Sequence, residues 1–132
     1  MKIVVDTNVL VRASVRDDAN QASAADHILK QATLIAVSVS CLCEFVWVLR
    51  RVYGFGAGDI AIAIRALMNT ENVVMNRPAV ESGLALLEMG GDFADGIIAY
   101  EGSWLGGETF VSFDRKAIAL LTEQGEPTHL LT

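Results

Sequence analysis

The chain has 132 residues, a length typical of one domain, and no stretch has the Pro-, Gly- or Ser-rich composition of a linker, so we expect a single domain over residues 1–132. Hydrophobic residues make up 52% of the chain, which excludes a disordered protein because a core can form. The net charge of −6 excludes binding of nucleic acid by bulk electrostatic attraction, because that mode needs an excess of Lys and Arg.

The first part of the chain is predicted to form a strand, a helix and a second strand. Lys2–Val5 is a short apolar strand, and Asp6, Thr7 and Asn8 follow it as a turn. Apolar residues at helical spacing predict a helix over Asn20–Gln31, and the β-branched segment Thr33–Val39 is predicted to be the next strand. This order is that of a crossover between parallel strands.

The segment Cys41–Arg51 is predicted to be a helix, because Glu44, Trp47 and Arg51 recur at three-to-four spacing. The apolar run from 34 to 49 is shorter than the roughly 20 residues of a membrane-spanning helix and contains Glu44, so we interpret it as buried protein. The two cysteines, Cys41 and Cys43, are spaced neither as a zinc knuckle nor as a thioredoxin pair. With no leader segment at Met1, we expect reduced thiols in a cytoplasmic protein.

The rest of the chain continues the alternation of helices and strands, so the predicted fold class is α/β. The predicted helices are Gly58–Met68, Pro78–Met89, Asp92–Trp104 and Asp114–Glu123, and the predicted strands are Val73–Met75, Thr109–Phe113 and Thr128–Leu131.

Four acidic residues are predicted to meet at one edge of the sheet. Asp6 and Asp114 each close a predicted strand, so in a parallel sheet both lie at the carboxyl edge, where open α/β sheets bind ligands. Glu44 lies about a turn and a half beyond the second strand, and Asp95 lies in the first turn of a helix that the same edge can receive.

A cluster of this kind would need a cation. Two carboxylates about 4 Å apart repel by roughly 4 kcal/mol at an effective dielectric near 20, so they take up protons or bind a metal. Oxygen ligands without His or Cys favour Mg²⁺ or Mn²⁺ over zinc. Such an ion can activate a water molecule and offset the charge of a phosphodiester, which would let an acidic protein act on a polyanion.

Simpler roles are open for most of these acids. Asp6, Asp92, Asp95 and Asp114 could each cap or begin a helix, and for Asp92 and Asp114 this is compatible with metal binding. For Glu44 we favour a functional role, because an isolated carboxylate in the most apolar stretch would be costly to bury without a partner or a metal.

Other polar and aromatic residues give weaker signals. We expect His27 and His129 to be surface or packed residues, and Trp47 and Trp104 to be core or interface residues without a catalytic role. Six basic residues could surround the acids and position a nucleic acid backbone, or could be ordinary surface residues: Arg12, Arg16, Arg50, Arg51, Arg115 and Lys116.

Four segments in order resemble the motifs of PIN-domain nucleases, and among these the VapC-type toxins of bacterial toxin–antitoxin pairs. They are Val4-Val5-Asp6-Thr7-Asn8-Val9-Leu10, Glu44, Asp92-Phe93-Ala94-Asp95-Gly96-Ile97-Ile98-Ala99 and Ser112-Phe113-Asp114-Arg115-Lys116. The resemblance spans nearly the whole chain, whereas the middle, from Arg50 to Glu88, has no family signature.

The resemblance implies a three-layer α/β/α sandwich with a central parallel sheet. It also implies a metal-binding quartet of Asp6, Glu44, Asp95 and Asp114, with Asp92 as an auxiliary ligand and Asn8 and Ser112 as orienting residues. Members of this group are homodimers that cleave RNA with Mg²⁺ or Mn²⁺ and are held by a small VapB-like antitoxin, often through a basic residue in the acidic pocket.

Several other functions compete with this interpretation. A phosphatase of the haloacid-dehalogenase type needs a second acid where Asn8 stands, and a phosphorylated receiver domain keeps its Asp after a later strand. A non-catalytic PIN-like binding module has no need for four mutually repelling acids. A housekeeping RNA-processing or DNA-cleaving PIN nuclease keeps the chemistry and changes the biological role.

Overall fold

Three short parallel strands form the sheet of the first half of the chain. The computed structural model describes residues 1–132 and divides them into two units, Met1–Asn76 and Arg77–Thr132. In the first unit, β1 (Lys2–Val4), β2 (Leu34–Ala36) and β3 (Val73–Val74) lie in the order β1-β2-β3. Ile3 lies opposite Ile35, which lies opposite Val73.

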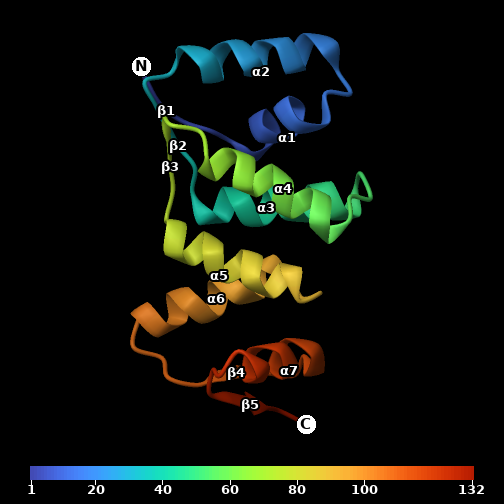
Figure 1. Cartoon of the computed structure of the whole chain (residues 1–132), viewed down its shortest axis with the longest axis vertical. Helices are drawn as coiled ribbons and strands as arrows, with labels where there is room; N and C mark the ends of the chain where they lie inside the picture. The colour runs from blue at the N-terminus through green and yellow to red at the C-terminus, as the bar shows by residue number, and fades with distance from the viewer. The chain divides into compact units, whose positions relative to one another are not determined.

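Four helices accompany this sheet (Figure 1): α1 (Thr7–Val15), α2 (Ala19–Gln31), α3 (Val39–Arg51) and α4 (Ala57–Met68). Helix α1 packs against both α2 and α3, and α3 also contacts α4. The core between them is made of large apolar side chains that are almost completely buried, among them Leu10, Leu42, Phe45, Leu49, Ile60 and Ile64.

The second unit begins with two closely packed helices, α5 (Arg77–Glu88) and α6 (Phe93–Trp104). Glycines allow the close approach: a Cβ atom on Gly83 would lie 2.7 Å from the Phe93 ring, and one on Gly96 would lie 2.9 Å from the Gly83 Cα. The remaining elements are β4 (Phe110–Ser112), α7 (Arg115–Glu123) and β5 (Thr128–Leu130), with β4 and β5 parallel and α7 in contact with both.

The predicted α/β class with parallel strands is confirmed, and every predicted helix and strand is found with shifts at its ends. One helix was missed, because Thr7 and Asn8, predicted as a turn, are the first residues of α1. The predicted single helix between the first two strands is therefore a pair, α1 and α2. The strand predicted over Thr33–Val39 ends at Ala36, since Ser38 caps α3 and Val39 is its first residue.

The two tryptophans do not lie in the core. Trp47 is 59% exposed and Trp104 is 77% exposed, so of the two predicted alternatives the core position is excluded for both, and an interface position stays a prediction. Cys41 is buried, Cys43 is half-buried, and both are free thiols, as predicted. None of the helices combines the length and the hydropathy needed to cross a bilayer.

Candidate functional site

In the first unit, Thr7 connects the first two predicted site residues. Asp6 follows β1 as the N-cap of α1, and its Oδ1 accepts a hydrogen bond from the Thr7 backbone N–H at 2.8 Å. The Thr7 side chain is almost buried, and its hydroxyl donates to Glu44 Oε2 at 3.1 Å. Asp6 and Glu44, far apart in the sequence, are therefore held by the same residue.

A buried thiol lies beside this pair. Cys41 Sγ is 3.8 Å from the Thr7 hydroxyl, but that hydroxyl has a single proton, and the charged Glu44 oxygen is the closer and stronger acceptor. The pKa of the Cys41 thiol is raised, mainly by burial and further by the negative charges of Asp6 and Glu44. The contact with Thr7 offsets only part of this rise in the pKa. Cys41 is thus a neutral thiol at neutral pH and not a nucleophile.

Glu44 is exposed, so the prediction that it would be buried was wrong. Helix α3 turns Leu42 and Phe45 into the core and leaves Glu44 and Trp47 on its outer face. The amphipathic pattern of the helix, and not an enclosed charge, explains how Glu44 is tolerated between Cys43 and Phe45. Its hydrogen bond with Thr7 is the observation that links it to Asp6.

In the second unit, two acids cap helices. Asp92 Oδ1 accepts from the Ala94 N–H at 3.0 Å at the start of α6. Asp114 Oδ1 accepts from the N–H groups of Lys116 and Ala117, both at 3.0 Å, at the start of α7. The capping roles considered for Asp6, Asp92 and Asp114 are therefore all found. Each cap uses Oδ1, so Oδ2 of each carboxylate is left to coordinate a metal ion.

Asp95 lies in the first turn of α6 and is half-buried. Burial raises the pKa of the Asp95 carboxyl above its ordinary value, and the charges of Asp92 and Asp114 raise it further. The charges of Asp92 and Asp114 thus disfavour ionisation of Asp95. A cation beside Asp95 would offset this repulsion. The hydroxyl of Ser112, one of the predicted orienting residues, accepts from the Asp114 N–H at 2.9 Å.

The structure thus connects Asp6 to Glu44 through Thr7 in one unit, and in the other unit the charges of Asp92 and Asp114 act on Asp95. Within neither unit do three His, Cys, Asp or Glu side chains form a group that could hold a metal ion. The donors are carboxylate oxygens, which suit Mg²⁺ and Mn²⁺. The meeting of all four acids in one quartet remains a prediction.

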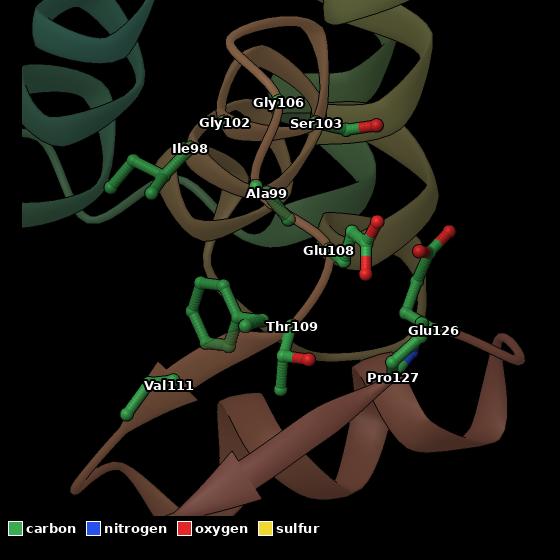
Figure 2. Close-up of a pocket in the computed structure, with 12 residues that line it drawn as sticks. Ile98, Ala99, Gly102, Ser103, Gly106, Glu108, Thr109, Val111, Glu126 and Pro127 are labelled. Atoms are coloured by element: carbon green, nitrogen blue, oxygen red, sulfur yellow. The ribbon is translucent and has the colours of Figure 1, made fainter.

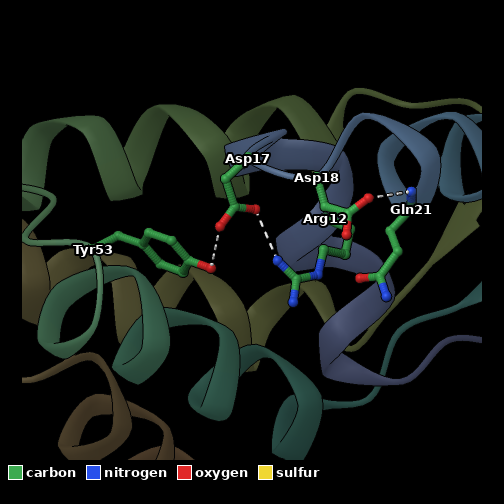
Figure 3. Close-up of polar contacts among 5 residues, drawn as sticks. All are labelled: Arg12, Asp17, Asp18, Gln21 and Tyr53. Atoms are coloured by element: carbon green, nitrogen blue, oxygen red, sulfur yellow. Dashed lines mark hydrogen bonds and ion pairs between the residues drawn. The ribbon is translucent and has the colours of Figure 1, made fainter.

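Two of the six basic residues are engaged in surface ion pairs. Arg12 Nη1 lies 2.8 Å from Asp17 Oδ1, and Arg16 Nη2 lies 2.8 Å from Asp26 Oδ2. Asp17 also accepts a hydrogen bond from the Tyr53 hydroxyl at 3.0 Å, as Figure 3 shows. Sequence reasoning missed this three-residue network, because nothing in the spacing of 12, 17 and 53 indicates it. His27 and His129 are exposed, as expected of surface residues.

The second unit also contains an open pocket of about 600 Å³. Figure 2 shows Ile98 and Ala99 on one side and Val111 and Pro127 on the other, with the carboxylates of Glu108 and Glu126 at its margin. No sequence pattern predicted it. No basic side chain lines it, so it is poorly suited to hold a phosphate group.

The family model described as PIN domain matches residues 3–120, a range that contains all four predicted quartet residues. No curated protein and no solved structure matches the chain.

Proposed function

The chain belongs to the PIN domain family, and we propose that within it this protein is a metal-dependent endoribonuclease that acts as the toxin of a toxin–antitoxin pair. PIN domains are typically nucleases, and they generally use divalent metal ions. In this proposal residues 1–132 form a single PIN domain, and RNA is the substrate.

The observation that best supports a catalytic role is the connection of Asp6 to Glu44 through Thr7. A structural N-cap needs only the backbone contact between Asp6 and Thr7, at 2.8 Å. The second contact, from the Thr7 hydroxyl to Glu44 at 3.1 Å, orients the Glu44 carboxylate. Because Glu44 lies on an exposed face of α3, this contact is not needed for the packing of the helix. Fixed carboxylates in pairs are what oxygen ligation of a divalent ion requires.

We assign metal binding to Asp6, Glu44, Asp95 and Asp114, with Asp92 as an auxiliary ligand and Mg²⁺ or Mn²⁺ as the ion. When bound, the ion would lower the pKa of a water molecule that it coordinates. The ion would also place a positive charge at the scissile phosphate. The chain's contribution is positioning: the helix caps orient Asp6 and Asp114 through Oδ1, and Ser112 fixes the backbone at Asp114.

The proposed partners are a VapB-like antitoxin and a second copy of the chain, in the cytoplasm. A net charge of −6 suits a partner that presents a basic segment. A short antitoxin gene beside the gene for this chain would support the toxin role. Its absence, together with cleavage of a defined RNA precursor or of DNA, would favour a housekeeping nuclease instead.

The decisive experiment compares two helix caps. Asp6→Asn keeps an N-capping side chain and removes the charge proposed to hold the ion, so RNA cleavage should fall by more than about 100-fold with the fold intact. Asp18 caps α2 through the same kind of bond, to the Gln21 N–H at 3.0 Å, but lies outside the quartet. Asp18→Asn should therefore cleave like the natural chain. Cleavage that persists in Asp6→Asn, or in excess EDTA, would refute the mechanism.

The chemistry of the products gives a second test. Attack by a metal-activated water leaves a 5′ phosphate and a 3′ hydroxyl, whereas attack by the ribose 2′ hydroxyl leaves a cyclic phosphate. We expect the first kind of end, measured by ligation-dependent sequencing of cleaved RNA. Recovery of cyclic phosphate ends would contradict water activation by a metal ion.

A further inference from the structure

A groove between α1 and α2 lies within two turns of helix from Asp6. Its polar lining is Asn8 and Arg12 on α1 and Gln21 on α2, and its volume is about 450 Å³. Asn8 stands two residues after Asp6, and Arg12 follows one helical turn later, about 6 Å further along the axis. The groove therefore starts beside a proposed metal ligand and leads away from it.

We propose that this groove binds a nucleobase of the RNA substrate, next to the phosphate that is cleaved, and thereby contributes to the choice of cleavage site. The inference rests on the proposed ribonuclease function and adds a specificity subsite to it. The occupant is the base of a single-stranded nucleotide.

The lining has the chemistry of a base-binding site. Asn and Gln amides present a donor and an acceptor side by side, which matches the edges of bases, and an Arg guanidinium can donate to a base or stack on it. Val9, Ala25 and Ile28 supply the apolar wall that a flat ring needs. The volume falls within the usual range of small-ligand pockets.

The charge of the groove separates it from the other cavities. Its lining contains one cation and no carboxylate. Glu108 and Glu126 line the pocket of the second unit, which has no cation in its lining and would repel a nucleotide phosphate. Another cavity of the first unit is lined by both Asp26 and Lys30, so its lining has no net charge. Among these cavities, the groove between α1 and α2 is the one whose lining carries a net positive charge.

Arg12 is held in a fixed orientation at the end of the groove. Its Nη1 donates to Asp17 Oδ1 at 2.8 Å, and Asp17 Oδ2 accepts from Tyr53 at 3.0 Å (Figure 3). Asp17 offsets part of the Arg12 charge, so Arg12 is a weaker phosphate clamp than a free arginine. The guanidinium has five N–H donors, and this contact uses one nitrogen. A fixed, partly neutralised guanidinium is better suited to hydrogen bonding or stacking with a base.

Binding of mononucleotides tests the groove without any cleavage. Each of the four nucleoside 5′-monophosphates is added to the ¹⁵N-labelled protein, and the side-chain amide signals of Gln21 and Asn8 are followed by NMR. We expect at least one nucleotide to shift both signals. Ala24, on the groove wall, is replaced by the bulky Ala24→Trp, which should weaken this binding by about 10-fold or more. Its exposed neighbour gives the matched control, Ser23→Trp, which should bind normally.

Sequencing of cleaved RNA ends provides the second measurement. Gln21→Ala should reduce the preference for one nucleotide beside the cut by about 10-fold, because a good bidentate contact to a base edge discriminates by that order. Gln31→Ala, on the same helix but outside the groove, should keep the natural preference.

The outcomes separate this inference from the proposed function. If RNA is cleaved but no nucleotide shifts the Gln21 amide and Gln21→Ala leaves the cleavage preference unchanged, the groove is not a base site and the ribonuclease stands. If a nucleotide binds as described but RNA is not cut with Mg²⁺ or Mn²⁺, the nucleotide site stands and the ribonuclease fails. Binding of an apolar peptide in the groove with no response to nucleotides would also overturn the base site.

Discussion

Thr7 is the residue that connects two of the proposed metal ligands, Asp6 and Glu44. Its side chain is only 8% exposed, and the hydroxyl lies between Glu44 and Cys41. Thr7→Val keeps the shape and removes the hydroxyl, so we expect a loss of only about 1 kcal/mol in unfolding free energy. Because Glu44 would lose its alignment with Asp6, RNA cleavage should fall by about 10-fold or more, as for outer-shell contacts at metal sites. Denaturant unfolding and cleavage assays measure the two effects.

A second threonine provides the control for this substitution. The Thr70 hydroxyl donates to the Ala66 carbonyl at 2.8 Å and to no predicted site residue. Thr70→Val should therefore lose a similar small amount of stability and no activity. Equal activity in Thr7→Val and Thr70→Val would show that the Thr7 bridge has no catalytic role.

Asp17 allows a prediction about pH. Hydrogen bonding from Tyr53 and from Arg12 lowers the pKa of the Asp17 carboxyl. A lowered pKa in the folded state means that the stabilisation is present above about pH 4 and is lost as the pH falls through the folded value. Asp17→Asn should therefore be slightly less stable than the natural chain at pH 7, and the gap should narrow as the pH falls through the folded-state pKa of Asp17. Thermal unfolding across this range measures the gap.

The control for Asp17→Asn removes one negative charge elsewhere. Glu71 is exposed in the loop before β3. Glu71→Gln changes the net charge by the same amount without touching the network. A stability gap for Asp17→Asn that stays constant from pH 7 to pH 3 would mean that the ionised carboxylate adds nothing to the network.

At the scale of elements, the packing of α5 against α6 depends on Gly96. A Cβ atom there would lie 2.9 Å from the Gly83 backbone and closer still to the Ser82 carbonyl, neither of which can yield. Gly96→Ala should therefore destabilise the protein by about 1–3 kcal/mol, although alanine is the better helix former. Gly102, in the same helix, has open space around it, so Gly102→Ala should stabilise by about 0.5–1 kcal/mol. Denaturant unfolding of both variants gives the comparison, and equal effects would contradict the packing.

The same elements show what the sequence could and could not predict. Helix α2 was found because its apolar residues recur at helical spacing, and α5 because Pro78 suits a first turn and Gly90 and Gly91 end a helix. The first two strands were found as short apolar or β-branched segments. Helix α1 was missed because Asp6-Thr7-Asn8 is a good turn sequence, and only the capping bond to Thr7 N–H reveals a helix start. The exposure of Glu44 was also missed. The prediction rested on the apolar composition of the surrounding segment, whereas the exposure depends on which face of α3 the residue occupies.

The sequence placed Asp6 and Asp114 after strands, as found, but not the contacts of the acids. Asp6 follows β1 and Asp114 follows β4, and these strands belong to two different sheets, so the predicted meeting of the two acids at one carboxyl edge stays a prediction. The Thr7 bridge and the Arg12–Asp17–Tyr53 network depend on side chains from separate elements, and no spacing along the chain encodes such contacts. Contacts of this kind follow from packing, which a single sequence does not show.

For the whole molecule, the central question is whether the acids of the two units act on one metal ion. If Asp6 and Glu44 share an ion with Asp95 and Asp114, Mn²⁺ at 100 times its Kd should stabilise the natural chain by about 2.7 kcal/mol, a rise in Tm of roughly 10 °C. Asp6→Asn and Asp114→Asn, one from each unit, should each abolish most of this rise. Asp18→Asn, a cap outside the quartet, should keep it.

The double variant makes the test specific for a shared ion. Ligands of one ion are not additive, so Asp6→Asn combined with Asp114→Asn should lose no more of the Mn²⁺ response than either change alone. Two independent ions, one in each unit, would instead leave about half of the response in each single variant and none in the double variant. That second pattern would disprove the quartet, because acids that respond separately to the metal cannot be ligands of the same ion.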